Sequence, residues 1–240
     1  AVVTVNPIPV ITATPPSSSI CPGPAHRLAF RSTAGGTAYT WSDTEASGVT
    51  GATACNSTCG SNISQTLTNS NSTSATATYT ITGTANNCSA SVAEIVTVNP
   101  TPQGSISGTT SICSGTSTAL TFNFTVGTSP FSVSYTDGTN VYIRTGVLNG
   151  DTFVVAPALG VTTYTFTSIT DANTCNRSSG FSGGASVTVT PLPTINSVVK
   201  TNVLCHGDST GTITITASSG TAPYSYSIDN GVCYQSGNVF

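Results

Sequence analysis

Short runs that alternate apolar with hydroxyl-bearing residues dominate this chain. Stretches such as "ATYTITG" and "TTYTFTS" place Tyr, Ile or Phe at every second position, with Thr between them. A period of two is typical of β-strands with one buried face, and β-branched and aromatic residues favour strands. No stretch has the period of an amphipathic helix. Because Gly, Asn, Asp and Ser separate the runs, the pattern predicts about seven short strands in each stretch of about 90 residues.

One strand pattern recurs along the chain. "VTVNP" stands at Val3–Pro7 and Val96–Pro100, and "VTVTP" stands at Val187–Pro191, so the copies are 93 and 91 residues apart. The two Val residues of each copy share one face of a strand, and the Pro after them ends the strand because it cannot donate to a ladder. A second Pro in "NPIP", "NPTP" and "TPLP" stiffens the chain beyond the strand. We interpret the motif as the last strand of a repeat and the linker to the next repeat.

Three further anchors keep the same order. Each copy is followed by a Cys, and an aromatic run lies 18, 18 or 19 residues after that Cys. A Tyr-rich strand then closes on an Asn-flanked Cys. The Cys residues after the linker are Cys21, Cys113 and Cys205, and the closing ones are Cys88 and Cys175. The sequence predicts a last strand of a preceding repeat at residues 1–7, full repeats at 8–100 and 101–191, and an incomplete repeat at 192–240.

Strand number and repeat length predict an all-β fold, with tandem immunoglobulin-like antiparallel sandwiches arranged as beads on a string in a rod. Trp41 is the single Trp and occupies the place where such sandwiches bury an aromatic residue. Tyr79 and Tyr164 are expected to be core or tyrosine-corner residues of a late strand. The full set of expected core aromatics is Trp41, Tyr79, Phe131, Tyr164 and Tyr224.

The chain carries few charged residues, and this excludes two classes of binding partner. Charged residues make up 5% of the chain and the net charge is −3, whereas about 25% is usual in soluble proteins. We therefore expect neither nucleic acid nor an anionic membrane surface as a partner. No apolar run is long enough to insert into a membrane. No signal peptide opens the chain, which we expect to be a processed piece or a segment of a longer protein.

Eight Cys and no Met favour an oxidising exterior over the cytosol. Cys55 and Cys59 in "CNSTC" have three residues between them and no His nearby, so we predict a local disulfide. The repeat predicts Cys21 with Cys88 and Cys113 with Cys175. An immunoglobulin topology, however, places Cys21 and Cys88 at opposite ends of a sandwich, and a disulfide needs Cα atoms within about 7 Å. Either the strand boundaries or the pairing must differ.

Two cysteines lie in the incomplete repeat. Cys205 is expected to pair beyond Phe240. Cys233 has no counterpart in the other repeats, and it either pairs with Cys205 or stays free.

Candidate chemistry is sparse. His26 and His206 are the only His residues, and few acids and bases are available for acid–base catalysis. We expect no enzyme and no catalytic or cofactor-binding residues; His206-Gly207-Asp208 is interpreted as a surface turn. The Asp residues of the turn sequences, which are Asp137, Asp171 and Asp229, are expected in Asx-type turns. Calcium takes six to eight oxygen ligands, and each loop offers too few carboxylates. We expect no metal site.

At its anchors the chain resembles known repeats. "ICPG", "ICSG", "YTW", "TYTIT…NNC" and "VTVNPTP" resemble PKD-like, immunoglobulin-like repeats of large bacterial surface proteins. "VLCHGDSTGTITITASSGTAPYSYSIDNG" is similar to the SprB repeat of gliding-bacterial adhesins. The stretch "WSDTEASG" departs from the PKD pattern, because it lacks the Gly-Asp-Gly that often follows the Trp.

The resemblance implies type IX secretion, a location outside the cell on the bacterial surface, and adhesion or gliding motility. It also makes Ser209, in "DST", an O-glycosylation candidate. On this basis the chain is expected to be a non-enzymatic adhesin segment that acts as stalk or adhesive module. Its expected partners are neighbouring repeats of the same chain and a surface polysaccharide or other surface ligand that the sequence does not identify.

Two alternatives stay open. The repeats could be spacers of a secreted hydrolase, or the chain could be a subunit of an extracellular fibre assembled by strand exchange. The Thr44–Asn62 segment, with its own Cys pair, is the most unusual loop and is a hypothesis for a contact surface.

Overall fold

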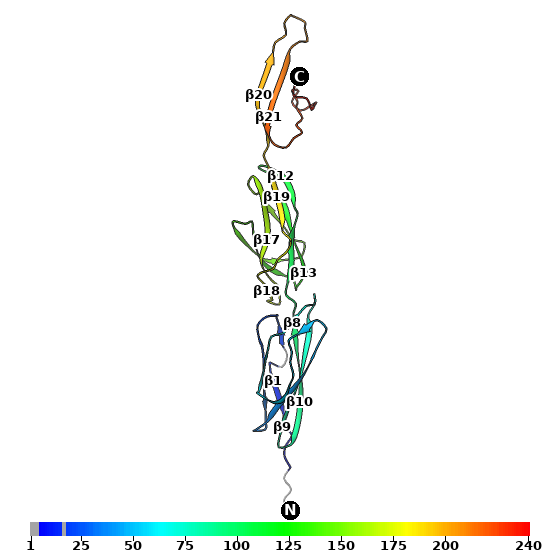
Figure 1. Ribbon diagram of the computed structural model, residues 1–240, viewed down its shortest axis with the longest axis vertical. Helices are drawn as coiled ribbons and strands as arrows, with labels where there is room; N and C mark the ends of the chain where they lie inside the picture. Colours follow the sequence, from blue (N-terminus) through cyan, green and yellow to red (C-terminus); the bar gives the residue numbers. More distant parts are fainter. Residues whose placement is uncertain (1–4, 16–17) are drawn as a thin grey trace, which may run out of the picture. The chain divides into compact units, whose positions relative to one another are not determined.

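The computed structural model describes residues 5–15 and 18–240, and every regular element in that part of the chain is a β-strand (Figure 1). Residues 1–4 of the expected strand at 1–7 lie outside the described residues. Residues 5–7 form no strand. The chain divides into two compact units, one of Ala1–Ile106, Phe122–Asp151 and Thr165–Gly183, the other of Ser107–Thr121, Thr152–Tyr164 and Gly184–Phe240.

The first repeat consists of two facing sheets, as a sandwich requires. One sheet has the order β1 (Ile11–Thr14), β3 (His26–Ser32), β7 (Asn62–Gln65). The other has the order β2 (Ser18–Ile20), β10 (Cys88–Val98), β9 (Ala75–Ala85), β4 (Ala38–Glu45), β6 (Cys55–Cys59). The short strands β5 (Val49–Thr50) and β8 (Thr68–Asn69) form a separate pair.

Apolar residues of the alternating runs meet between these sheets. Phe30 of β3 is 2% exposed, and its ring packs edge-on against Tyr39 and Trp41 of β4, with centroid distances of 4.9 and 5.8 Å. Tyr79 and Ile81 of β9 are also fully buried. The long β9–β10 hairpin, whose strands lie side by side in Figure 1, keeps its Thr and Ser residues on the outer face, where Thr82 and Ser91 hydrogen-bond each other at 2.8 Å.

The second repeat contains β11 to β19. Their bounds are β11 (Gln103–Ser107), β12 (Thr110–Cys113), β13 (Thr118–Val126), β14 (Phe131–Thr136), β15 (Val141–Val147), β16 (Thr152–Val155), β17 (Gly160–Thr170), β18 (Asn176–Arg177) and β19 (Ala185–Thr190). In the first unit, β14 pairs with β15 and with the end of β17, and Phe131 stacks on Phe124. In the second unit, β19 pairs with the start of β17 and with β12, and Tyr164 is buried against Phe153.

The last segment has a two-stranded sheet of β20 (Pro193–Thr201) and β21 (Thr212–Ser219). Residues after Gly220 run back along β21, and Phe240 exchanges both backbone hydrogen bonds with Ile213. Tyr224, expected in a core, is only partly buried and donates a hydrogen bond to the Ser219 carbonyl. The reason is that no second sheet faces the β20–β21 ladder within the described residues. Trp41, Tyr79, Phe131 and Tyr164 are buried.

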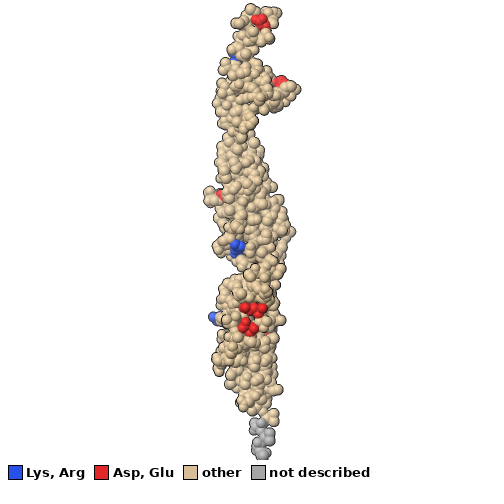
Figure 2. All heavy atoms as spheres, turned by 45° about the vertical axis from the view of Figure 1, so that its right-hand side comes forward, with Lys and Arg blue, Asp and Glu red and all other residues tan. Residues whose placement is uncertain are grey.

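An all-β architecture of tandem immunoglobulin-like sandwiches is thus confirmed. Pro100 and Pro102 of the linker between the two PKD-like repeats are both buried, whereas Pro191 and Pro193 of the last linker are exposed. Figure 2 shows how few charged side chains one face of the molecule carries, as the 5% charged composition requires.

Candidate functional site

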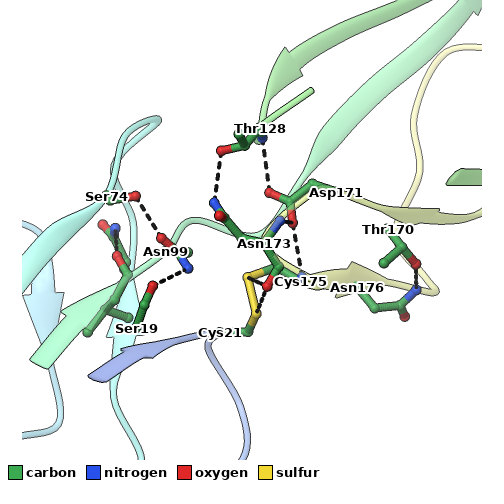
Figure 3. Close-up of a disulfide and its surroundings, with 12 residues drawn as sticks. Ser19, Cys21, Ser74, Asn99, Thr128, Thr170, Asp171, Asn173, Cys175 and Asn176 are labelled. Carbon is green, nitrogen blue, oxygen red and sulfur yellow. Dashed lines mark hydrogen bonds between the residues drawn. A yellow bond between two sulfur atoms is a disulfide. The ribbon is translucent and has the colours of Figure 1, made fainter. Parts of the chain in front are cut away.

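Cys21 is positioned by a short parallel strand at the end of the first repeat. β2 runs parallel to the last residues of β10, so that Ile20 lies opposite Val98. The Asn99 backbone N–H then donates to the Ile20 carbonyl at 2.8 Å. The Asn99 side chain, 4% exposed, donates to Ser19 Oγ at 2.9 Å and accepts from Ser74 Oγ at 2.8 Å (Figure 3). Cys21 is therefore fixed beside the residue that starts the linker.

Cys175 is positioned by a loop built on one carboxylate. Asp171 is 5% exposed, and its Oδ1 accepts the backbone N–H groups of Asn173 and Cys175, each at 3.0 Å. Its Oδ2 accepts the Thr128 N–H at 3.0 Å. The Asn173 side chain donates to Thr128 Oγ1 at 2.8 Å (Figure 3). This is the expected Asx-type turn, and it holds Cys175 in one conformation.

The structure joins Cys21 to Cys175, with a Cα–Cα distance of 5.2 Å (Figure 3). The two residues are separated by 154 positions and belong to successive repeats. The Cys21 sulfur lies 3.6 Å from the Asn173 carbonyl oxygen, and Cys175 is 1% exposed. Gly127, whose φ is +113°, lets the chain pass close to Pro102 and to the Asp171 loop. A Cβ at this position would meet Pro102 at 3.1 Å and Asp171 at 3.4 Å.

The prediction that Cys21 pairs with Cys88 and Cys113 with Cys175 is therefore wrong. Cys88 starts β10 and Cys21 follows the strand that pairs with the end of β10. At about 3.3 Å per residue, the length of β10 separates them by roughly 30 Å. Cys88 and Cys113 are free thiols in this structure, Cys88 half-buried and Cys113 exposed. Cys205 and Cys233 are free and exposed as well.

The Thr44–Asn62 segment is more ordered than a loop. It contains β5 and β6, and β6 pairs with β4 so that Cys55 lies opposite Trp41 and Cys59 opposite Tyr39. Cys55 and Cys59 form a disulfide across 6.3 Å between Cα atoms. The Trp41 indole N–H donates to the Thr53 carbonyl at 3.0 Å, and the Gln65 side chain donates to the same oxygen at 2.7 Å.

Several titratable groups make hydrogen bonds within the fold. His26 makes a 3.2 Å hydrogen bond with Ser18 Oγ, and partial burial lowers the pKa of its imidazole. Burial, with added repulsion from Asp43 and Glu45, raises the pKa of Tyr79 to about 12, and its hydroxyl donates to Gln65. The Asp229 carboxylate accepts the Cys233 N–H at 3.0 Å, which lowers its pKa.

Asp137 closes an exposed turn in the same way. It accepts the N–H groups of Asn140 and Thr139 at 2.6 and 2.8 Å, and these bonds hold the pKa of its carboxyl well below the ordinary value. Within the residues that the structure describes, no group of three His, Cys, Asp or Glu side chains could hold a metal ion. No helix there is long and apolar enough to cross a membrane.

The hollows on the described surface include two that are lined by aromatic residues. One, of about 390 Å³, lies between β20–β21 and the segment after Gly220; its aromatic residues are Tyr224 and Tyr226, whose ring centroids are 6.3 Å apart, and Thr194, Ser225 and Ser227 add hydroxyls. The other, of about 210 Å³, includes Arg177, whose guanidinium lies 5.2 Å from the Phe181 ring centroid. His206 and Ser209 lie on the exposed segment between β20 and β21.

Comparison with known proteins agrees with this architecture. The model of the PKD-like domain family matches residues 18–102, and that of the SprB repeat family matches residues 197–232. None of the curated proteins matches.

Similar solved structures include the titin I-band fragment I67-I69, which has 10% identity and a TM-score of 0.44 over 89% of this chain and 77% of that chain. Another is that of fibronectin(III)-like modules of CbhA from Clostridium thermocellum, with 9% identity and a TM-score of 0.32 over 76% of this chain and 95% of that chain. The four N-terminal immunoglobulin domains of Dscam1 isoform 6.44 match with 13% identity and a TM-score of 0.33, over 78% of this chain and 47% of that chain.

Proposed function

We propose that this chain, in which one stretch matches the PKD-like domain and another matches the SprB repeat, is a non-enzymatic shaft segment of a long cell-surface adhesin used in surface attachment and gliding. The observation that carries the proposal is the Cys21–Cys175 disulfide, which joins one repeat covalently to the next. Such a bond persists outside the cell, where thiols are oxidised. A shaft benefits from it because the bond limits the length of polypeptide that can extend when a repeat unfolds.

Adhesion needs a contact surface as well as a shaft, and the groove on the last segment is the best candidate. Partly buried Tyr224 and Tyr226 offer aromatic faces, and the surrounding Ser and Thr residues offer hydroxyl groups. A concave site with an apolar wall and a few polar groups is the usual form of a small-ligand site. We assign it to a neutral surface polysaccharide, because the lining residues carry no charge.

The shaft is tested on intact cells of the source bacterium. Antibody against this chain should label cells without permeabilisation, and the label should be lost when the type IX secretion machinery is deleted. A strain without the protein should attach and glide less. Labelling that needs permeabilisation, or attachment and gliding that do not change, would refute the function.

The groove is tested by binding of the purified chain to polysaccharide prepared from the cell surface or from the substratum. Replacing Tyr226 by Ala should weaken binding about tenfold, as the loss of one aromatic contact would. Tyr234→Ala is the matched control, because Tyr234 is 67% exposed and lies outside the groove. Equal binding by both variants would place the ligand elsewhere.

Glycosylation at Ser209 belongs to the same proposal. Ser209 lies on an exposed segment without regular structure, so an enzyme can reach it. Intact-mass measurement of the native protein and of a Ser209→Ala variant should differ by a glycan; a difference of one oxygen atom would exclude the modification.

A further inference from the structure

The two PKD-like repeats hold their first cysteines in equivalent places. Cys21 follows β2, where Ile20 pairs in parallel with Val98. Cys113 ends β12, where Ile112 pairs in parallel with Val189. Both belong to the same "SIC" triplet. Because the strand next to each of them is the last of its repeat, each cysteine lies at the end where its repeat meets the next one.

The closing cysteines are equivalent in the same way. Cys175 follows the turn after β17, and Cys88 follows the Asn86-Asn87 turn after β9. Cys175 is bonded to the preceding repeat, whereas Cys88 is half-buried and free. Each repeat therefore has one cysteine at its C-terminal end that can bond to the following repeat, the donor, and one at its N-terminal end that can bond to the preceding repeat, the receiver. Among the described residues, one such bond is formed, between Cys21 and Cys175.

The linker asparagines, Asn6 and Asn99, contact the two kinds of cysteine position. Asn6 and Asn99 occupy the same position of the "VTVNP" motif. Asn99 contacts Ser19 in the "SIC" triplet of the repeat that it closes. Asn6 contacts the hairpin of the repeat that it opens, since it donates to the Asn86 carbonyl at 3.4 Å, and its own carbonyl accepts from Cys88 Sγ at 3.7 Å. The linker asparagine thus borders a donating triplet in one linker, through Asn99, and a receiving cysteine in the other, through Asn6.

We propose that Cys88 is the receiving site for a cysteine in the "SIC" triplet of another PKD-like repeat, placed ahead of Asn6. The partner of Cys88 is thus a repeat of the same kind, and together with the Cys21–Cys175 bond the disulfides form a ladder that joins successive PKD-like repeats. Cys113 occupies the equivalent donor position of the second repeat. Each link forms one S–S bond from two thiols. With oxidised glutathione as oxidant, the two electrons and two protons leave as two molecules of glutathione.

The decisive experiment is non-reducing peptide mapping of the native protein by mass spectrometry. The peptide with Cys88 should be linked to a peptide that contains "SIC" or a close variant of it from another repeat, while Cys21 is linked to Cys175. A link within one polypeptide and a link between two copies are distinguished by the mass of the protein before reduction. Cys88 found free, or linked to Cys21, would overturn the proposal.

A second experiment uses the complete chain with an additional copy of residues 8–100 placed directly before Ile8, which reproduces the "VTVNPIP" junction. After oxidation with glutathione, the Cys21 of the added copy should be protected from iodoacetamide and linked to the Cys88 of the original chain. Replacing that original Cys88 by Ser should free the added cysteine, whereas the control Cys113→Ser should leave the new link intact. If the added cysteine reacts in the unsubstituted chain, the ladder does not exist.

Discussion

Two hairpins of this molecule have similar strand lengths and different surroundings. β9 and β10 pair over eleven residues each, and β20 and β21 pair over a similar length. Ile81 and Val98 are completely buried, whereas Val198 and Val199 are 57% and 58% exposed. The difference lies in the second layer: the β1-β3-β7 sheet covers the first hairpin, and every residue of β20 remains exposed. An alternating pattern thus specifies a strand, while burial depends on a second sheet that faces it.

The largest difference in stability between the first repeat and the last segment should come from the inter-repeat disulfide. Replacing both Cys21 and Cys175 by Ser should lower the free energy of unfolding by about 5 kcal/mol, because the bond closes a loop of more than 150 residues. Trp41, the single Trp, reports unfolding of the first repeat by fluorescence in urea. The matched control replaces the free Cys205 and Cys233 and should leave the Trp41 transition in place. Equal transitions in both proteins would mean that the bond does not constrain the first repeat.

Removing one aromatic ring from the core should reveal almost as large a difference in stability between the two regions. Phe30→Ala deletes a ring that contacts Tyr39 and Trp41, and we expect a loss of about 3–5 kcal/mol. Val198→Ala in β20 should change stability by no more than about 0.5 kcal/mol, since that side chain is exposed. Calorimetry of both variants checks the pair. A comparable cost for Val198→Ala would show that a hidden layer covers β20.

A smaller effect is expected from the carboxylate that holds the Cys175 loop. Asp171→Ala leaves three backbone N–H groups without their acceptor and should cost about 1–3 kcal/mol. It should also slow formation of the Cys21–Cys175 bond, which is measured by thiol labelling during oxidative refolding. Asp137→Ala, in an exposed turn of the same type, is the control and should leave that rate unchanged. If both variants refold alike, Asp171 does not position Cys175.

The smallest effect should appear as a pH dependence of the first repeat. Glu94 is 6% exposed, and burial raises the pKa of its carboxyl above the ordinary value. The folded state therefore disfavours the charged form, so its stability is full below the ordinary pKa and falls as the pH rises through the raised pKa. Glu94→Gln should flatten this fall and slightly stabilise the repeat at neutral pH. Urea midpoints between pH 4 and 8 test it; an unchanged slope would assign the dependence to another group.

Much of the fold could be predicted from local pattern. Period-two runs such as the one around Tyr79 indicated the strands, and the recurrence of "VTVNP" indicated the last strand of each repeat, because these signals act over a few residues. Tyr224 shows where local pattern fails. Its run has the same alternation as the run around Phe131, but side-chain burial depends on distant chain that the pattern does not contain.

The disulfide was missed for a different reason. In a repeating chain, Cys88 and Cys175 have the same local signals, so spacing alone cannot say which of them Cys21 meets. The parallel pairing of β2 with the end of β10 decides it, because it places Cys21 at the far end of its repeat. The signal available in the sequence was geometric: a bond between opposite ends of one sandwich was already inconsistent with disulfide dimensions.

The Cys21–Cys175 bond also sets the route that mechanical tension takes. When the chain is pulled from segments outside this pair, force passes from Cys21 through two sulfur atoms to Cys175, and residues 22–174 carry none of it. At about 3.4 Å per residue, roughly 500 Å of extensible polypeptide is withheld from stretching. Reduction would release that length, so the redox state of one bond determines whether this region behaves under load as a short tether or a long one.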